Sequence, residues 1–345
     1  MEFERKLPTE DEDVAQIVQG ILALQARYAA QQDRPLARGT HAKGVCVGAT
    51  FEVFDVAKTI SDPVLAARLA RGVFATPGRY LASVRFANAA STFLSDSDAD
   101  VRALSFFIEV PPGVVGPTAR RLDFSMNDAP TFTINDAHVF ADFLRMDTKP
   151  SGLAKLKALF SLPFKERLGI YATGILAKKQ QQVPTRPYQH IRYWSTVPFL
   201  HGPDQAMKYS AIPRSADPGH PMEKGDDVLR DSLVRHVNED SEMSAFDFGL
   251  QLLDLERMTH YGRPREASYW IENASVEWNE AEAPFHIVGR LTLERQSVVL
   301  ADTCNALYID VTENSLPDGR PLGSINRARW AAESASRKAR LGARP

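Results

Sequence analysis

An alternating run near the N-terminus most constrains how this chain of 345 residues can fold. Apolar side chains alternate with small or polar ones over residues 45–54, which is typical of a strand with one buried face. The sequence Arg-Gly-Thr-His-Ala-Lys-Gly, residues 38–44, precedes this run directly and places His41 at the mouth of the strand. An imidazole there can move protons near neutral pH, because its ordinary pKa is about 6.5. A lone histidine is more often a hydrogen-bonded loop or core residue, so both interpretations stay open.

Periodicity predicts further elements along the chain. Alternating or evenly spaced apolar residues favour strands over 81–86, 104–110, 246–252, 270–278 and 291–300. Helical spacing predicts a first helix that follows the capping pattern at residues 9–12, a second over 64–71, and one that begins after Asp136. It also predicts two helices over 152–182, separated at Pro163, and one that begins after Asp226 or Asp227. The first helix is expected to serve packing or oligomerisation. Aspartates at 96, 98 and 100 lack the pattern of a calcium loop and predict a solvated loop.

Composition is that of an ordinary globular protein, with 44% hydrophobic and 24% charged residues. The net charge of −2 provides no overall field that would recruit nucleic acid or an anionic membrane. No apolar run reaches roughly 18 residues, so we expect no membrane span. Cys46 and Cys304 have no metal-ligand spacing and are expected to be reduced and buried. These features together favour a cytoplasmic protein.

The sequence around His41 resembles the distal-histidine segment of the haem catalase family. The shared pattern is Arg-x-x-His-Ala-Lys-Gly followed by a Gly-x-Phe-Glu-Val type of strand. The resemblance implies that His41 stands over one face of a haem and moves the proton of a bound peroxide. Thr40 occupies a position where true catalases usually carry valine, and its hydroxyl can hold one tautomer of the imidazole. In this respect the chain is more similar to the small catalase-related peroxidases, which lowers the expectation of fast dismutation.

Two further segments resemble the same family. Arg85 lies in a Val-Arg-Phe sequence where catalases place an arginine that binds a haem propionate, and a guanidinium can pair bidentately with a carboxylate. Residues 122–132 carry the spacing Asp-Phe-x-x-x-Asn-x-x-Pro-x-Phe of the segment that supplies the distal asparagine. The resemblance implies that the Asn127 amide donates a hydrogen bond to bound peroxide. It also implies that Phe132 and Phe140 flank the haem and the His41 ring.

The C-terminal region resembles the approach to the proximal helix of small catalase-like proteins, but one position departs from the pattern. Arg329 and Arg340 stand at the family spacing, whereas Glu333 replaces the tyrosine whose phenolate is the fifth ligand of the iron. Three explanations stay open. Glu333 ligates the iron with Arg329 holding it ionised, or haem binds without a strong protein ligand. Alternatively, Glu333 only pairs with Arg329 or Arg337 on a solvated helix and the iron site is lost.

The resemblance covers residues 38–340 and implies an N-terminal helical arm, 1–35, followed by a single catalase-like haem domain, 36–345. The implied fold is α+β: an antiparallel β-barrel core with surrounding helices and a C-terminal proximal helix. One haem b would be held by Arg38, Arg85, Arg329, Arg340, Phe132 and Phe140, with His41, Asn127 and Thr40 as catalytic residues and Glu333 as the metal ligand.

The implied function is that of a catalase-related oxidoreductase acting on hydrogen peroxide or organic hydroperoxides, and poor at dismutation. The expected partner is this small-molecule substrate, and we expect no binding to nucleic acid. The resemblance is also compatible with a homo-oligomer. Two alternatives remain. One is a haem-dependent tailoring enzyme of Lewis-acid or oxygenase type, and the other is a catalase-fold binding protein without turnover.

Overall fold

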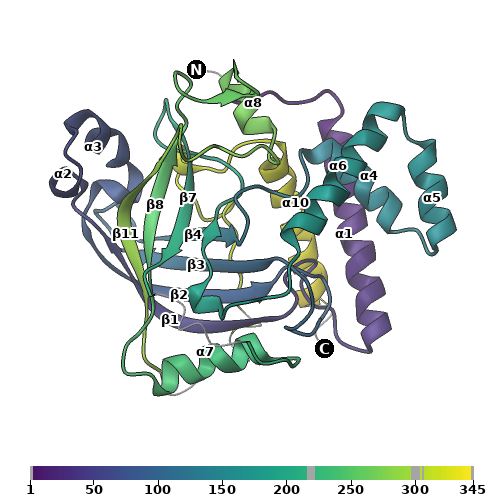
Figure 1. Ribbon diagram of the computed structural model, residues 1–345, viewed down its shortest axis with the longest axis horizontal. Helices are drawn as coiled ribbons and strands as arrows, with labels where there is room; N and C mark the ends of the chain where they lie inside the picture. Colours follow the sequence, from purple (N-terminus) through teal and green to yellow (C-terminus); the bar gives the residue numbers. More distant parts are fainter. Residues whose placement is uncertain (1–2, 216–221, 297–303, 305–306, 343–345) are drawn as a thin grey trace.

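An antiparallel barrel forms the centre of the molecule (Figure 1). The computed structural model describes residues 3–215, 222–296, 304 and 307–342. Eight strands close the barrel in the order β5-β4-β3-β2-β1-β11-β8-β7, because β5 pairs with β7 as well as with β4, and β6 extends from β7. The strands are β1 (Gly44–Val53), β2 (Gly78–Asn88), β3 (Arg102–Val110), β4 (Arg120–Asn127), β5 (Tyr193–Trp194), β6 (Phe199–Leu200), β7 (Ala206–Pro213), β8 (Ala245–Leu252) and β11 (Phe285–Leu293).

Aromatic side chains fill the barrel because alternate residues of each strand point inward. Burial alternates strictly along β1, as its sequence pattern predicts, and Phe51 is fully buried. The Phe51 ring lies 5.3 Å from Phe106 and 5.2 Å from Phe248, measured between ring centroids. Burying each such side chain stabilises the fold by about 1.5–3 kcal/mol. The strands predicted over 81–86, 104–110 and 246–252 are confirmed as parts of β2, β3 and β8.

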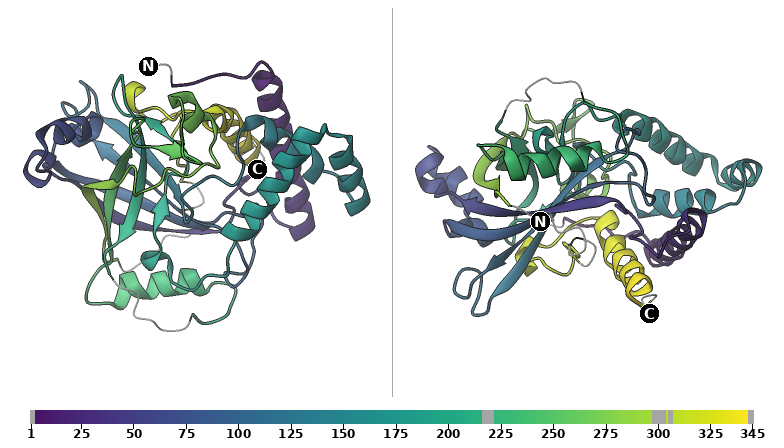
Figure 2. Two further views of the ribbon diagram at one scale, coloured as in Figure 1. Left: turned by 45° about the horizontal axis from the view of Figure 1, so that its top comes forward. Right: turned by 90° about the horizontal axis from the view of Figure 1, so that it is seen from below.

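Three helices pack together beside one end of the barrel (Figures 1 and 2). They are α1 (Glu10–Gln32), α4 (Ala137–Asp147) and α10 (Ser324–Gly342). Ile17 and Ile21 of α1 share an apolar cluster with Ala141 of α4 and Ala328 of α10. An ion pair also links α10 to α1, since Nε of Arg327 lies 2.6 Å from a carboxylate oxygen of Glu10. The first helix is therefore tied into the same body as the last.

The helices predicted over 64–71, after Asp136, over 152–182 and after Asp226 or Asp227 are present, whereas α2 (Val56–Thr59) and α8 (Ala267–Glu272) were not predicted. Asp136 caps α4 by accepting from the Val139 amide, and the break at Pro163 separates α5 (Gly152–Ser161) from α6 (Phe164–Gln180). The remaining helices are α3 (Pro63–Leu69) and α7 (Val228–Glu239). Among the described residues no helix has the length and apolar character needed to cross a membrane. The α+β barrel fold predicted from the sequence is confirmed.

The prediction of two reduced cysteines is wrong, because Cys46 and Cys304 form a disulfide. Cys46 lies on the outer face of β1, between the buried Val45 and Val47, where a segment from beyond β11 reaches it. The Cα atoms are 5.3 Å apart, within the usual range for a disulfide. Because disulfides are rare in the cytosol, the cysteines no longer support a cytoplasmic location.

Two other local predictions are also wrong. Residues 270–278 form no strand: Trp270 ends up buried in the short helix α8, and Trp278 is buried in the loop beyond it. The loop with three aspartates is not wholly solvated, since Asp96 and Asp100 are buried and accept hydrogen bonds from Asn88 and from the Ala90 amide. The strand predicted over 291–300 corresponds to the end of β11, and residues 297–300 lie outside the described residues.

Candidate functional site

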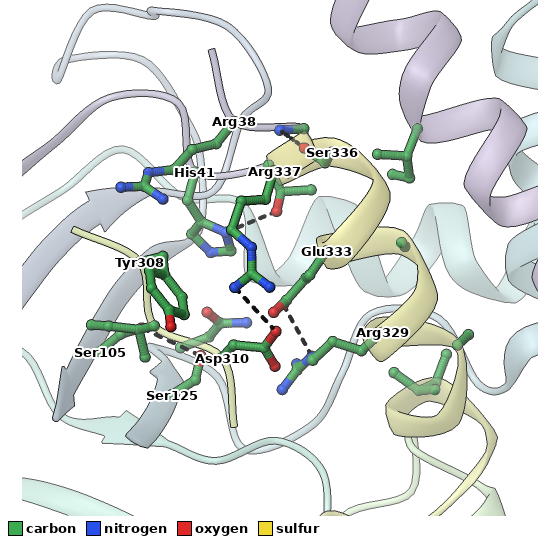
Figure 3. Close-up of a pocket in the computed structure, with 18 of the residues that line it drawn as sticks. Arg38, His41, Ser105, Ser125, Tyr308, Asp310, Arg329, Glu333, Ser336 and Arg337 are labelled. Atoms are coloured by element: carbon green, nitrogen blue, oxygen red, sulfur yellow. Dashed lines mark hydrogen bonds and ion pairs between the residues drawn. The ribbon is translucent and has the colours of Figure 1, made fainter. Parts of the chain in front are cut away.

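A cavity between the barrel and α10 brings together the ten residues that the sequence predicts for a haem site, and Figure 3 labels Arg38, His41, Arg329 and Glu333 among them. It encloses about 1360 Å³ of space, part of which is open to solvent. Its lining includes Arg38, Thr40, His41, Arg85, Asn127, Phe132, Phe140, Arg329, Glu333 and Arg340. These residues come from the segment before β1, from β2 and β4, from α4 and its approach, and from α10. The barrel and its helical layer thus meet at one site.

Backbone geometry holds His41 at the edge of the cavity. Its φ of 57° lies in the left-handed region that residues other than glycine rarely adopt. The His41 amide donates to the Ala89 carbonyl at 3.1 Å, and Arg85 Nη2 donates to the His41 carbonyl at 2.8 Å. Gly44 leaves room for the Arg85 side chain to reach the His41 carbonyl, since a Cβ at residue 44 would lie 2.5 Å from Arg85 Nη2. Arg85 therefore supports the histidine backbone and also faces the cavity.

The His41 ring carries one fixed contact and one open nitrogen. Nδ1 lies 3.2 Å from Oγ1 of Thr40, while Nε2 is buried and has no hydrogen-bond partner among the described residues. Burial, and then the charges of Arg85 and Arg329, lower the pKa of His41 to about 3, and the Asn127 amide opposes this shift. The ring is consequently neutral at pH 7.

A cluster of arginines gives the cavity a strong positive charge. Burial, followed by the charges of Arg85 and Arg340, lowers the pKa of Arg38 to about 9. Burial and Arg340 likewise lower the pKa of Arg85 to about 10. Arg38 is held in place by donating to the Cys304 carbonyl at 3.2 Å and to the Leu307 carbonyl. These guanidinium groups repel one another, so an anionic ligand would relieve the repulsion.

Glu333 projects from α10 into the same cavity (Figure 3). Its Oε1 lies 3.6 Å from Nε of Arg329, one helical turn away. Burial, and then the charge of Asp310, raise the pKa of Glu333 to about 7, although Arg329 and Arg337 oppose the shift. The side chain is 41% exposed, and it is exposed toward the cavity that it lines. Glu333 therefore both pairs with Arg329 and lines the cavity.

Several lining residues were missed by the sequence interpretation. Tyr308 and Asp310 precede α10, and the Arg337 guanidinium carbon lies 4.4 Å from the Tyr308 ring centroid and Nη1 3.9 Å from Asp310. Ser336 accepts from the Gly39 amide at 3.0 Å. The spacing of 333, 336, 337 and 340 on one helix face is the signal that identifies Ser336 and Arg337. No comparable pattern marks Tyr308 or Asp310.

The cavity suits a mostly apolar molecule that also carries negative charge. Five arginines, at 38, 85, 329, 337 and 340, face two carboxylates, at 310 and 333, which leaves a net charge of +3 when all are ionised. The apolar walls include Ile17, Ile325 and the rings of Phe132 and Phe140, whose centroids are 6.5 Å apart. The buried Nε2 of His41 and Nε of Arg85 have no hydrogen-bond partners in the described part of the chain. The residues therefore fit haem b, a planar dicarboxylate.

Solved structures with this architecture are catalases. Catalase A from Saccharomyces cerevisiae superposes with a TM-score of 0.66 and 14% identity over 92% of this chain and 63% of that chain. A fungal catalase gives 0.64 and 15% over 92% and 61%, and a bacterial catalase gives 0.61 and 15% over 93% and 60%. No protein-family model matches the sequence, and no curated protein is detectably similar to it.

The chain therefore has the catalase fold, as its sequence motifs predict. It spans somewhat less than two thirds of the length of the catalases it matches. At 14–15% identity the likeness establishes the fold alone, so the chemistry has to be argued from the cavity.

Proposed function

We propose that this chain is a haem-dependent oxidoreductase that acts on hydrogen peroxide or organic hydroperoxides and is slow at dismutation. The observation that carries the proposal is the buried Nε2 of His41, which has no hydrogen-bond partner within 3.5 Å among the described residues and shares one cavity with a cluster of arginines and with Glu333. The neutral ring supplies a base, the arginines supply an anion site, and the carboxylate supplies an oxygen donor. These groups come from the segment before β1, from β2 and from α10, which the fold brings together around one cavity.

The residues that would hold haem can be assigned from their chemistry. Arg38, Arg85 and Arg340 would bind the propionates, because guanidinium groups pair bidentately with carboxylates. Phe132 and Phe140 would flank the macrocycle. Glu333 would supply a carboxylate oxygen to the iron, with Arg329 favouring its ionised form. Bound haem would supply an iron centre for redox reaction at the O–O bond of the substrate.

His41 and its neighbours would move the substrate proton. With the ring proton on Nδ1, His41 donates to Oγ1 of Thr40 and leaves the Nε2 lone pair in the cavity. Nε2 then accepts the proton of a peroxide and later returns it, as a general acid–base. The Asn127 amide donates a hydrogen bond that orients the same substrate. Thr40 acts through His41 and is a positioning residue.

Glu333 accounts for the expected slow dismutation. A carboxylate donates less electron density to iron than a phenolate does, and axial-ligand identity is the main means by which a protein tunes haem reactivity. Restoring the family residue with Glu333→Tyr should add phenolate-to-iron charge-transfer bands and raise oxygen evolution from hydrogen peroxide. Glu333→Ala should weaken haem binding and alter the ferric spectrum.

A matched control is available for this experiment. Glu313 also pairs with an arginine, at 2.9 Å from Arg337 Nη2, but it is 46% exposed and is not among the described residues that line the cavity. Glu313→Ala should leave the haem spectrum unchanged. A ferric spectrum that is the same in Glu333→Ala as in the wild type would remove the axial-ligand role and favour the ion-pair explanation.

The presence of Glu333 at the position where the catalase family has tyrosine also favours a second candidate function. A weaker axial donor leaves the iron a stronger Lewis acid, which suits haem-dependent tailoring chemistry without a peroxide substrate. Haem-loaded protein that keeps its Soret band but consumes neither hydrogen peroxide nor organic hydroperoxides would favour this function over the first. Protein that binds no haem would favour a catalase-fold binding protein.

A further inference from the structure

A second group of chemically reactive side chains lies outside the cavity, where α4 meets α6. His138 and Asp142 are one turn apart on α4, and Glu166 lies in the first turn of α6. One ligand atom from each of these three residues falls within 4.8 Å of the other two. None of the three belongs to the described lining of the cavity. The group is therefore separate from the proposed haem site.

The His138 ring is oriented by a carboxylate on a third helix. Its Nδ1 lies 3.0 Å and 3.1 Å from the two carboxylate oxygens of Asp13 on α1, so Nδ1–H donates to Asp13. On the other side of the ring, Nε2 makes a long hydrogen bond of 3.5 Å to Glu166 Oε1 and lies 3.9 Å from Asp142 Oδ2. Metal-binding histidines characteristically donate their second N–H to such a carboxylate, which fixes the tautomer and the ring orientation.

Asp142 provides an independent indication that a ligand is expected here. Its side chain is only 2% exposed, and Oδ2, the oxygen that faces His138, has no hydrogen-bond partner in the described part of the chain. The other oxygen, Oδ1, faces Arg145 at 3.4 Å. A buried carboxylate oxygen without a partner is unfavourable, and the 3.9 Å to His138 is too long for a hydrogen bond. A cation bound between Oδ2, His138 and Glu166 would satisfy it.

The local charge also calls for a cation. Asp13, Asp142 and Glu166 place three carboxylates around His138, and Arg145 pairs only with the far oxygen of Asp142. His138 and Glu166 are 31% and 27% exposed, so an ion can reach the site from solvent and keep a water ligand.

We propose that His138 Nε2, Asp142 and Glu166 bind one divalent transition-metal ion, with Asp13 as the residue that positions His138. A set of one imidazole nitrogen and two carboxylate oxygens suits Zn²⁺ or a neighbouring first-row ion. Ca²⁺ and Mg²⁺ take oxygen ligands and fit it less well. Because α4 and α6 provide the ligands and α1 provides Asp13, the ion would fasten the three helices together.

The test is calorimetric titration of the EDTA-treated, full-length chain with Zn²⁺, in haem-free and haem-loaded protein. We expect one Zn²⁺ per chain in both forms, with no change in any haem spectrum. Asp142→Asn and Glu166→Gln should each lower the affinity at least tenfold. Asp13→Asn should lower it by about 10–100-fold, because it removes the partner of Nδ1. Bound Zn²⁺ should show one nitrogen and two protein oxygens by X-ray absorption.

Asp240 provides the matched control. It forms an i, i+4 pair with His236 on α7, with His236 Nδ1 2.6 Å from Asp240 Oδ2, and no third carboxylate joins this pair in a described metal-binding group. Asp240→Asn should bind Zn²⁺ as the wild type does. Circular dichroism verifies the fold of each variant, and the partly exposed Glu166 provides a second variant if Asp142→Asn does not fold. Wild-type protein without saturable Zn²⁺ binding, or folded Glu166→Gln with wild-type affinity, would overturn the proposal.

Discussion

At physiological pH the imidazole of His41 is a neutral base, because burial and nearby arginines hold its pKa at about 3. Its ordinary pKa is 6.5, so the unfolded chain binds this proton more readily than the folded chain does. The stability due to neutral His41 is therefore present above pH 6.5 and is lost as the pH falls toward 3. The ring is therefore in its proton-accepting form throughout the physiological range, but a pKa of about 3 makes it a weaker base than an ordinary imidazole.

Replacement of His41 tests its role directly. His41→Ala should retain haem and lower peroxide turnover by about 10²–10⁴, the usual contribution of a general acid–base. Asn127→Ala should have a smaller effect, because it removes one hydrogen bond and no proton transfer. His190→Ala serves as a control, since His190 is outside the described cavity lining. Peroxide turnover that is unchanged in His41→Ala would place the chemistry elsewhere.

Glu333 should give the haem-free protein a pH-dependent instability. Its folded pKa of about 7 lies above the ordinary 4.5, so the proton that it binds stabilises the fold below pH 4.5. This stability is lost as the pH rises through about 7. In thermal unfolding, Glu333→Gln should therefore raise the Tm relative to wild type at about pH 8 and change it little at about pH 4.5. An equal difference at both pH values would contradict the assigned burial of Glu333.

At the scale of elements, the disulfide fixes the segment that holds Arg38. It joins Cys46 on β1 to Cys304, whose carbonyl accepts from Arg38, across a sequence separation of 258 residues. Cys46→Ser should lower the free energy of unfolding in denaturant by about 2–5 kcal/mol. Adding Cys304→Ser to this variant should have little further effect, because both substitutions remove the same bond. A single variant as stable as the wild type would show that the bond is absent or contributes nothing.

The long periodic elements were predictable from sequence, and the short or non-local ones were not. β1, β2, β3 and β8 alternate because one face of each packs inside the barrel. The tryptophans at 270 and 278 share only even spacing, and tertiary packing buries them in a one-turn helix and a loop. The pairing of Cys46 with Cys304 follows from the pairing of β1 with β11, strands far apart in the sequence, which no local pattern encodes.

At the scale of the whole molecule, the predicted site residues meet because the fold joins distant segments. The segment before β1 and the strands β2 and β4 supply His41, Arg85 and Asn127, and α10 supplies Glu333 across the cavity lining. Motifs within one segment could be found by resemblance. Tyr308 and Asp310 could not, because they lie in an irregular segment whose place beside the cavity depends on tertiary contacts, such as those with Arg337, Arg121 and Asp123.

The most direct test of this account is an absorbance titration of the purified full-length chain with haem. The arginine cluster and the apolar walls predict a Soret band that saturates at one haem per chain. Arg85→Ala should weaken this binding, because it removes a buried cation from the propionate site. A titration of folded wild-type protein with no saturable Soret band would contradict the central claim that the cavity holds haem.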